Sequence, residues 1–141
     1  MGDYPRIFRL KQKFQCSTIP DVAATVESQL QSLQLANRIR PGESVAITAG
    51  SRGIRNIAEV VTAIARHVKG LNAIPFIVPA MGSHGGGTVS GQLEVLESYG
   101  ITEASCGCEI RATMDTLVVC EAKEGFPVYF DKYAANADHV I

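Results

Sequence analysis

Residues 44–53 read SVAITAGSRG, a short apolar run followed at once by a turn of small residues. A mostly apolar run of this length is typical of a strand that is buried on both faces of a parallel sheet. The glycines of the turn let the chain bend sharply. After the turn, apolar residues recur at helical spacing from residue 54 to residue 68, and Lys69 and Gly70 are typical of a helix end. The stretch therefore predicts a strand, a tight turn and a helix.

The same order of elements follows once more along the chain. Residues 74–79 (IPFIVP) predict a second buried strand, although its prolines weigh against an interior position in the sheet. Residues 82–87 (GSHGGG) form the glycine-rich turn after it. Thr88 is predicted to cap the next helix, and Gly100 to end that helix in a left-handed conformation.

The flanking segments predict further elements. Residues 7–10 indicate a first strand, and residues 18–21 (TIPD) indicate a helix that begins with Thr18 as its N-cap. The last third predicts strands over 116–122, 127–130 and 139–141, with a helical turn near 132–136. Alternating strands and helices predict an α/β fold, a three-layer Rossmann-like domain with a mostly parallel sheet. Because the chain stops inside a predicted strand, we expect a domain that is truncated at its C-terminus.

The composition limits the kinds of function that the chain can be expected to have. The chain has 141 residues, 46% hydrophobic and 19% charged, as expected for one globular domain. A formal net charge of −1 provides no basic surface for a phosphate backbone, so no nucleic-acid partner is expected. Neither a signal peptide nor an apolar run of membrane-spanning length is apparent, which predicts no membrane partner and a cytoplasmic location.

The cysteines give a weak signal. Their spacing is not that of a secreted disulfide framework. Cys106 and Cys108 could form half of a metal site, but a single C-x-C without further ligands is more typical of small residues at a turn, which is the interpretation we favour.

The two glycine-rich turns carry the side chains that could bind a ligand or take part in catalysis. Ligands of open α/β sheets bind outside the carboxyl ends of the strands, where turns 50–53 and 82–87 are predicted to lie. Arg52 offers a planar donor fork for a carboxylate or phosphate, although an arginine beside a helix start is as often solvated or ion-paired. His84, set between glycines and off any apolar helix face, is a candidate proton carrier. His67, near the C-terminal end of its helix, is explained by a dipole contact or by exposure, and His139 is interpreted as structural. If the two strands are neighbours, Arg52 and His84 face one crevice.

Three known motifs do not explain these turns. No lysine follows either turn at P-loop spacing, and the dinucleotide fingerprint G-x-G-x-x-G is absent. Residues 84–87 (HGGG) match the oxyanion loop of some esterases, but the sequence lacks the G-x-S-x-G elbow that would carry the nucleophile.

The chain resembles the lactate racemase family, whose members carry a nickel pincer cofactor, in its N-terminal domain. The resemblance lies in segments 45–54 (VAITAGSRGI), 79–86 (PAMGSHGG), 92–101 and 137–141, which span most of the chain in this order. It implies that residues 1–141 are the partial N-terminal α/β domain of a larger two-domain isomerase. Such enzymes racemise or epimerise 2-hydroxyacids by reversible hydride transfer to a nickel pincer nucleotide.

The resemblance also implies roles for particular residues. His84 matches the first of two histidines that alternate as general base and acid, and Arg52, with Ser51 beside it, matches the group that orients the substrate. Cofactor-binding positions implied by the two turns are Gly50, Gly82, Ser83, Gly85 and Gly86. The second histidine, the lysine that tethers the cofactor and the nickel ligands belong to later segments of the family, so no metal ligand is expected here and the chain alone is expected to be inactive.

One position departs from the family pattern. Lactate racemases proper have an aspartate three residues before the arginine, where this chain has Ala49. The implied substrate is therefore a small 2-hydroxyacid rather than lactate in particular. Two alternatives remain open: a non-catalytic α/β module that binds a carboxylate- or phosphate-bearing ligand through the two turns, and a family member that has lost the cofactor. Whether the chain forms a homo-oligomer is open as well.

Overall fold

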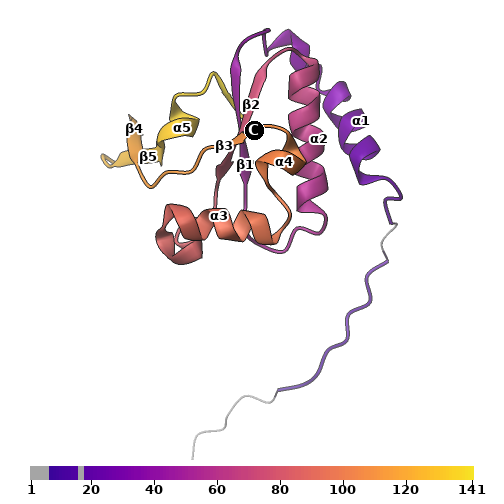
Figure 1. Ribbon diagram of the computed structural model, residues 1–141. Helices are drawn as coiled ribbons and strands as arrows, with labels where there is room; N and C mark the ends of the chain where they lie inside the picture. The colour runs from indigo at the N-terminus through magenta and orange to yellow at the C-terminus, as the bar shows by residue number, and fades with distance from the viewer. Residues whose placement is uncertain (1–6, 16–17) are drawn as a thin grey trace, which may run out of the picture.

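The computed structural model describes residues 7–15 and 18–141, and the second of these segments forms an α/β domain (Figure 1). Its main sheet has four strands in the order β3-β2-β1-β6. These strands are β1 (Ser44–Ala49), β2 (Ile74–Pro79), β3 (Glu109–Ile110) and β6 (His139–Val140). All three pairings are parallel. The predicted mostly parallel, Rossmann-like sheet is confirmed.

Helices and a separate hairpin complete the chain. The helices are α1 (Val22–Ser32), α2 (Ile57–Gly70), α3 (Val89–Ser98), α4 (Glu103–Cys106) and α5 (Lys132–Ala135). Short 3₁₀ turns lie at η1 (Leu35–Asn37) and η2 (His84–Gly87). Strands β4 (Thr116–Glu121) and β5 (Pro127–Asp131) pair antiparallel with each other. No helix of the described segments is long and apolar enough to cross a membrane.

Strands β1 and β2 lie side by side in the middle of the sheet. They pair in parallel from Ser44 with Ile74 to Ala49 with Pro79, so both end at the same edge. The interior position of β2 is compatible with its prolines because β3 pairs with Phe76 and Ile77, which leaves the proline positions outside that ladder.

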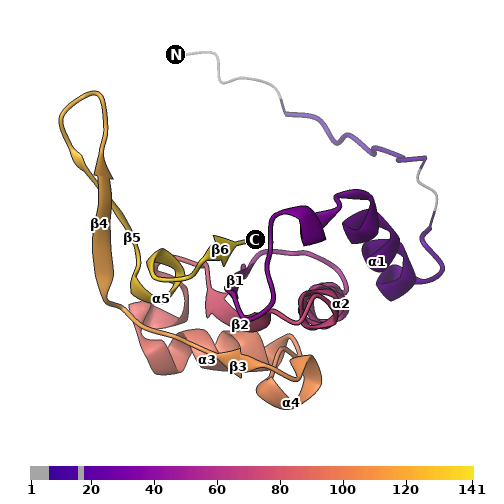
Figure 2. The same cartoon turned by 90° about the horizontal axis from the view of Figure 1, so that it is seen from above.

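The side chains of β1 alternate between the two faces of the sheet. Ile47 and Ala49 face a core formed with α2, α3 and α4; its buried members are Ile47, Ala49, Ile57, Val61, Ala65, Ile77, Leu96, Ile101 and Cys106. Ala46 faces the other side with Phe76 and Val78, where Ala134 of α5 covers them. Helices therefore lie on both faces, which confirms the three layers (Figure 2). Burial of Phe76 or Ile47 contributes about 1.5–3 kcal/mol each.

Helix α1 packs on α2 rather than on the sheet (Figure 1). Its N-cap is Asp21 and not Thr18, because Asp21 has the extended backbone of a cap and its carboxylate accepts from the Ala24 amide at 2.8 Å. The Glu27 carboxylate of α1 lies 2.9 Å from Nδ1 of His67 on α2. The predicted helix is present, but its N-cap lies three residues later than predicted.

The predicted first strand at residues 7–10 is wrong. Residues 7–15 have no regular structure and extend away from the domain in Figures 1 and 2. Ile7, Phe8 and Leu10 are 97%, 83% and 74% exposed. The pattern of the segment suits a strand, but the edges of the main sheet are formed by β3 and β6 and do not pair with it.

The last third contains the predicted strands in an unexpected arrangement. β4 and β5 form a hairpin that projects from the main sheet, with every side chain of β4 exposed (Figure 2). The pairing shifts between Val118 and Cys120, an irregularity that twists the ribbon. After α5, β6 returns to the main sheet beside β1. Sequence reasoning did not predict α4 or β3.

Candidate functional site

The two glycine-rich turns meet at the carboxyl edge of the main sheet. Turn 50–53 follows β1 and turn 82–87 follows β2, and the two strands are neighbours. The Ala80 amide donates to the carbonyl of Ala49 at 2.8 Å and continues the ladder to the very base of both turns. The expectation that the turns open at one edge is confirmed.

Arg52, His84 and Ser51 are in mutual contact at this edge. Nη2 of Arg52 lies 3.2 Å from Nε2 of His84, and Oγ of Ser51 lies 2.5 Å from Nδ1 of the same ring. Arg52 is exposed, whereas His84 and Ser51 are partly buried. Because a guanidinium can only donate, Nε2 of the imidazole accepts in this arrangement. The site therefore brings a fixed positive charge beside a proton-accepting nitrogen.

The turn that carries His84 is held by the start of α3. Gln92 is 4% exposed, and its side-chain amide donates to the carbonyl of Gly82 at 2.8 Å. The Thr88 hydroxyl donates to the carbonyl of Gly85 at 3.0 Å and accepts from the Gly91 amide at 3.1 Å as the predicted N-cap. These bonds fix the backbone on both sides of His84.

The backbones of Gly85 and Gly91 touch. A Cβ built on Gly85 would lie 2.5 Å from the carbonyl oxygen of Gly91, and one built on Gly91 would lie 2.6 Å from the carbonyl carbon of Gly85. Gly85 also has φ +65°, a left-handed conformation that favours glycine. The glycine at position 85 is therefore explained by packing of the turn against α3.

The end of the same helix holds the first turn. The hydroxyl of Tyr99, which directly follows α3, donates to the carbonyl of Ser51 at 2.8 Å. Gly100 has φ +80°, and the Ile101 amide donates back to the Leu96 carbonyl at 3.0 Å, as predicted for this helix end. α3 thus contacts both turns, one with each end.

Sequence reasoning assigned no role to Gly91, Gln92 or the hydroxyl of Tyr99. Gly91 had a detectable signal, since a glycine in the first turn of a helix indicates a close approach of another backbone. The contacts of Gln92 and Tyr99 depend on how α3 crosses the sheet edge, which no local pattern encodes.

The remaining positions expected to bind a cofactor lie around the same edge. Cβ atoms built on Gly82 and Gly86 would meet no described atom within 4 Å, and both residues have positive φ. A Cβ on Gly50 would lie 3.8 Å from the Ala80 carbonyl oxygen, an ordinary contact. Ser83 is exposed. Space for a ligand is therefore available beside Gly82 and Gly86.

The cysteine pair is part of the fold. Cys106 ends α4 inside the core, and Gly107 follows in a left-handed conformation with its carbonyl accepting from Nζ of Lys69. Burial raises the pKa of the Cys108 thiol. Within residues 7–15 and 18–141, no group of three or more His, Cys, Asp or Glu side chains could hold a metal ion.

The other two histidines pair with carboxylates away from the turns. His67 contacts Glu27, as described above, and Nε2 of His139 lies 2.7 Å from Oε2 of Glu43. Hydrogen bonds from the Arg40 amide and from His139 lower the pKa of Glu43. The contact of His139 agrees with its structural interpretation, whereas His67 is paired with Glu27 rather than exposed.

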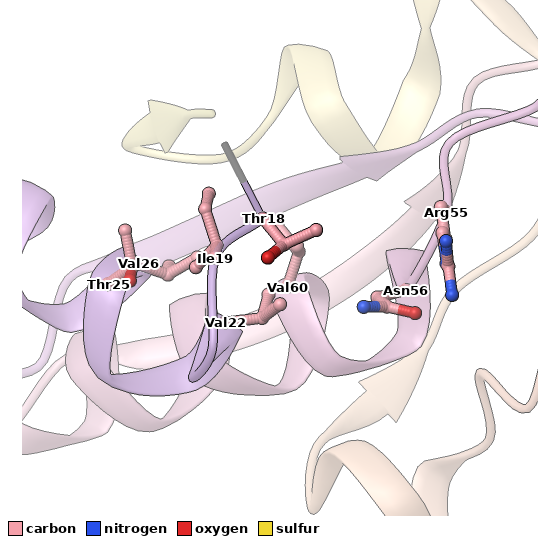
Figure 3. Close-up of a pocket in the computed structure, with 8 residues that line it drawn as sticks. All are labelled: Thr18, Ile19, Val22, Thr25, Val26, Arg55, Asn56 and Val60. Carbon is pink, nitrogen blue, oxygen red and sulfur yellow. The ribbon is translucent and has the colours of Figure 1, made fainter. Parts of the chain in front are cut away.

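Two hollows lie near the site without including Arg52 or His84. The larger, about 490 Å³, lies between the start of α1 and the start of α2, with apolar residues at one end and Arg55 and Asn56 at the other (Figure 3). The second, about 320 Å³, lies beside the end of β2, where Met81, Gln92 and Asp115 are among the lining residues. The crevice expected between Arg52 and His84 is neither of these hollows, because the two side chains contact each other directly.

Comparisons with protein-family models, with curated proteins and with solved structures find no match for this chain.

Proposed function

We propose that this chain is the substrate-binding N-terminal part of a 2-hydroxyacid racemase or epimerase that uses a nickel pincer nucleotide, as members of the lactate racemase family do. The observation that carries the proposal is the 3.2 Å contact between Nη2 of Arg52 and Nε2 of His84. It combines a carboxylate-binding group and a proton acceptor at the sheet edge where α/β proteins bind ligands.

The proximity of these two groups suits a 2-hydroxyacid. In such an acid the carboxylate and the hydroxyl sit on adjacent carbons, so their oxygens are themselves neighbours. Because the fold brings the guanidinium and the imidazole into contact, each can bind one of these oxygens once Arg52 releases Nε2.

The proposed binding step replaces one contact by two. Arg52 leaves Nε2 and turns its donor fork to the carboxylate, which its exposed side chain permits. The substrate hydroxyl then donates to the freed Nε2. His84 would accept the hydroxyl proton of one enantiomer, while the bound cofactor would supply the acceptor for the C2 hydride. The second histidine expected outside this chain would serve the other enantiomer. The nickel ligands are expected in later segments, as the resemblance implies, so the step described here concerns only the substrate.

The test uses the protein that carries this chain, purified from its native host. We expect it to contain nickel and to interconvert the enantiomers of a 2-hydroxyacid such as lactate, malate or mandelate, measured by chiral chromatography. His84→Ala should abolish the activity. His67→Ala is the matched control, since His67 pairs with Glu27 away from the turns, and it should retain activity. Equal activity of the wild type and His84→Ala would refute the proposal.

A non-catalytic anion-binding module is the second candidate, favoured by the exposed guanidinium and by the open space at Gly82 and Gly86. Such a module would bind phosphate or acetate as well as lactate, lose affinity in Arg52→Ala, and carry no nickel. Nickel content together with ligand selectivity separates the two functions.

A further inference from the structure

We propose that Arg52 and Ser51 together fix the tautomer of His84, with Ser51 as the positioning residue that accepts the Nδ1 proton, so that Nε2 is the acceptor that faces the ligand. The resemblance suggested a substrate contact for Ser51. The structure instead shows its hydroxyl 2.5 Å from Nδ1 of His84. The catalytic role of this tautomer rests on the proposed function, but the test of the tautomer needs neither substrate nor cofactor.

The proton assignment follows from the two partners of the ring. Arg52 can only donate, so Nε2 must carry the lone pair in the observed contact. The proton of the neutral ring is then on Nδ1 and is donated to Oγ of Ser51. A neutral histidine side chain in water prefers the opposite tautomer, with its proton on Nε2, so the protein must stabilise the form required here. A hydroxyl can accept this proton, whereas an alanine in its place could not.

The position of Ser51 is itself fixed. The Tyr99 hydroxyl donates to the Ser51 carbonyl at 2.8 Å, and Ser51 lies two residues beyond the last residue of β1. On the other side, Gln92 and Thr88 fix the backbone around His84. The Ser51–His84 contact therefore joins two turns that other hydrogen bonds hold in place, which limits rotation of the His84 ring.

The same geometry argues against Ser51 as a nucleophile. A serine nucleophile needs an adjacent base that accepts its proton. Here Nδ1 already carries a proton and donates it, while the accepting nitrogen, Nε2, faces Arg52. Ser51 therefore acts through His84, and loss of its hydroxyl should change the state of the ring rather than remove a reacting atom.

The experiment is ¹⁵N NMR of the 141-residue chain with labelled histidine, recorded at a pH where His84 is neutral. The chain has three histidines, and His84→Gln assigns the signal of interest. We expect Nδ1 of His84 to show the protonated signature and Nε2 the unprotonated one. Ser51→Ala should shift the population toward the Nε2–H tautomer, Ser51→Thr should restore the wild-type signature, and Arg52→Ala should also shift the population toward the Nε2–H tautomer.

Controls keep the outcomes distinct. Ser98→Ala removes an exposed hydroxyl that donates to the Val95 carbonyl within α3, and it should leave the ring unchanged. The signals of His67 and His139 report whether each variant is folded. A wild-type spectrum with Nε2 protonated overturns the inference even if no variant folds. So does an unchanged His84 tautomer in folded Ser51→Ala.

Discussion

Replacement of Gly91 by alanine tests the close contact that sets the His84 turn against α3. At an ordinary helix position, Gly→Ala stabilises a protein by about 0.4–1 kcal/mol. At Gly91 the new Cβ would lie 2.6 Å from the Gly85 carbonyl carbon and 3.0 Å from its Cα, and both atoms belong to the backbone and cannot rotate away. Overpacking of this kind costs about 1–3 kcal/mol, and a displaced Thr88 cap costs about 1 kcal/mol more. We expect a net loss of about 1–3 kcal/mol in the free energy of unfolding.

The assay is urea unfolding followed by circular dichroism, with Gly70→Ala as the matched control. Gly70 is the last residue of α2, its φ is not positive, and a Cβ there would meet no described atom within 4 Å. Gly70→Ala should therefore raise the midpoint slightly while Gly91→Ala lowers it. The two variants should therefore shift the urea midpoint in opposite directions. A Gly91→Ala variant as stable as the control would mean that the two backbones do not touch and that the account of the turn is wrong.

Two further predictions concern ionisable groups. The pKa of Asp138 is lowered by hydrogen bonds from the side chain and the amide of Ser44. Because its folded-state pKa is lower than its unfolded-state pKa, the stabilisation is present above about pH 4 and is lost as the pH falls through the folded value. The urea midpoint should drop below about pH 4, and Asp138→Asn should lose less on acidification than the wild type; an identical acid dependence would contradict this. Alkylation at pH 8, read by peptide mass spectrometry, should modify exposed Cys120 well before Cys108, whose thiol has a pKa raised by burial. Faster modification of Cys108 would contradict the described burial.

The central part of the fold could be predicted because its local signals agree. The apolar runs of β1 and β2, the helical spacing in α2, the Thr88 cap and the left-handed Gly100 each indicated the element that forms. Strands in such a repeat tend to be neighbours and end at one edge, so the proximity of Arg52 and His84 followed from topology before any side chain was placed.

Other features depend on contacts between distant residues. The Tyr99–Ser51 bond joins residues 48 positions apart, and the Gln92–Gly82 bond requires the helix to cross the end of β2. A strand of two residues such as β3 leaves no periodic pattern to detect. The segment at residues 7–10 has the pattern of a strand but forms none, because a strand needs a free sheet edge with which to pair.

The most direct test of the central claim is a calorimetric titration of the 141-residue chain with lactate, propionate and 3-hydroxypropionate. If Arg52 and His84 together recognise a carboxylate and its adjacent hydroxyl, lactate binds most tightly, and either Arg52→Ala or His84→Ala removes its advantage. Equal affinity for all three acids, or an advantage of lactate that survives both substitutions, would contradict the account.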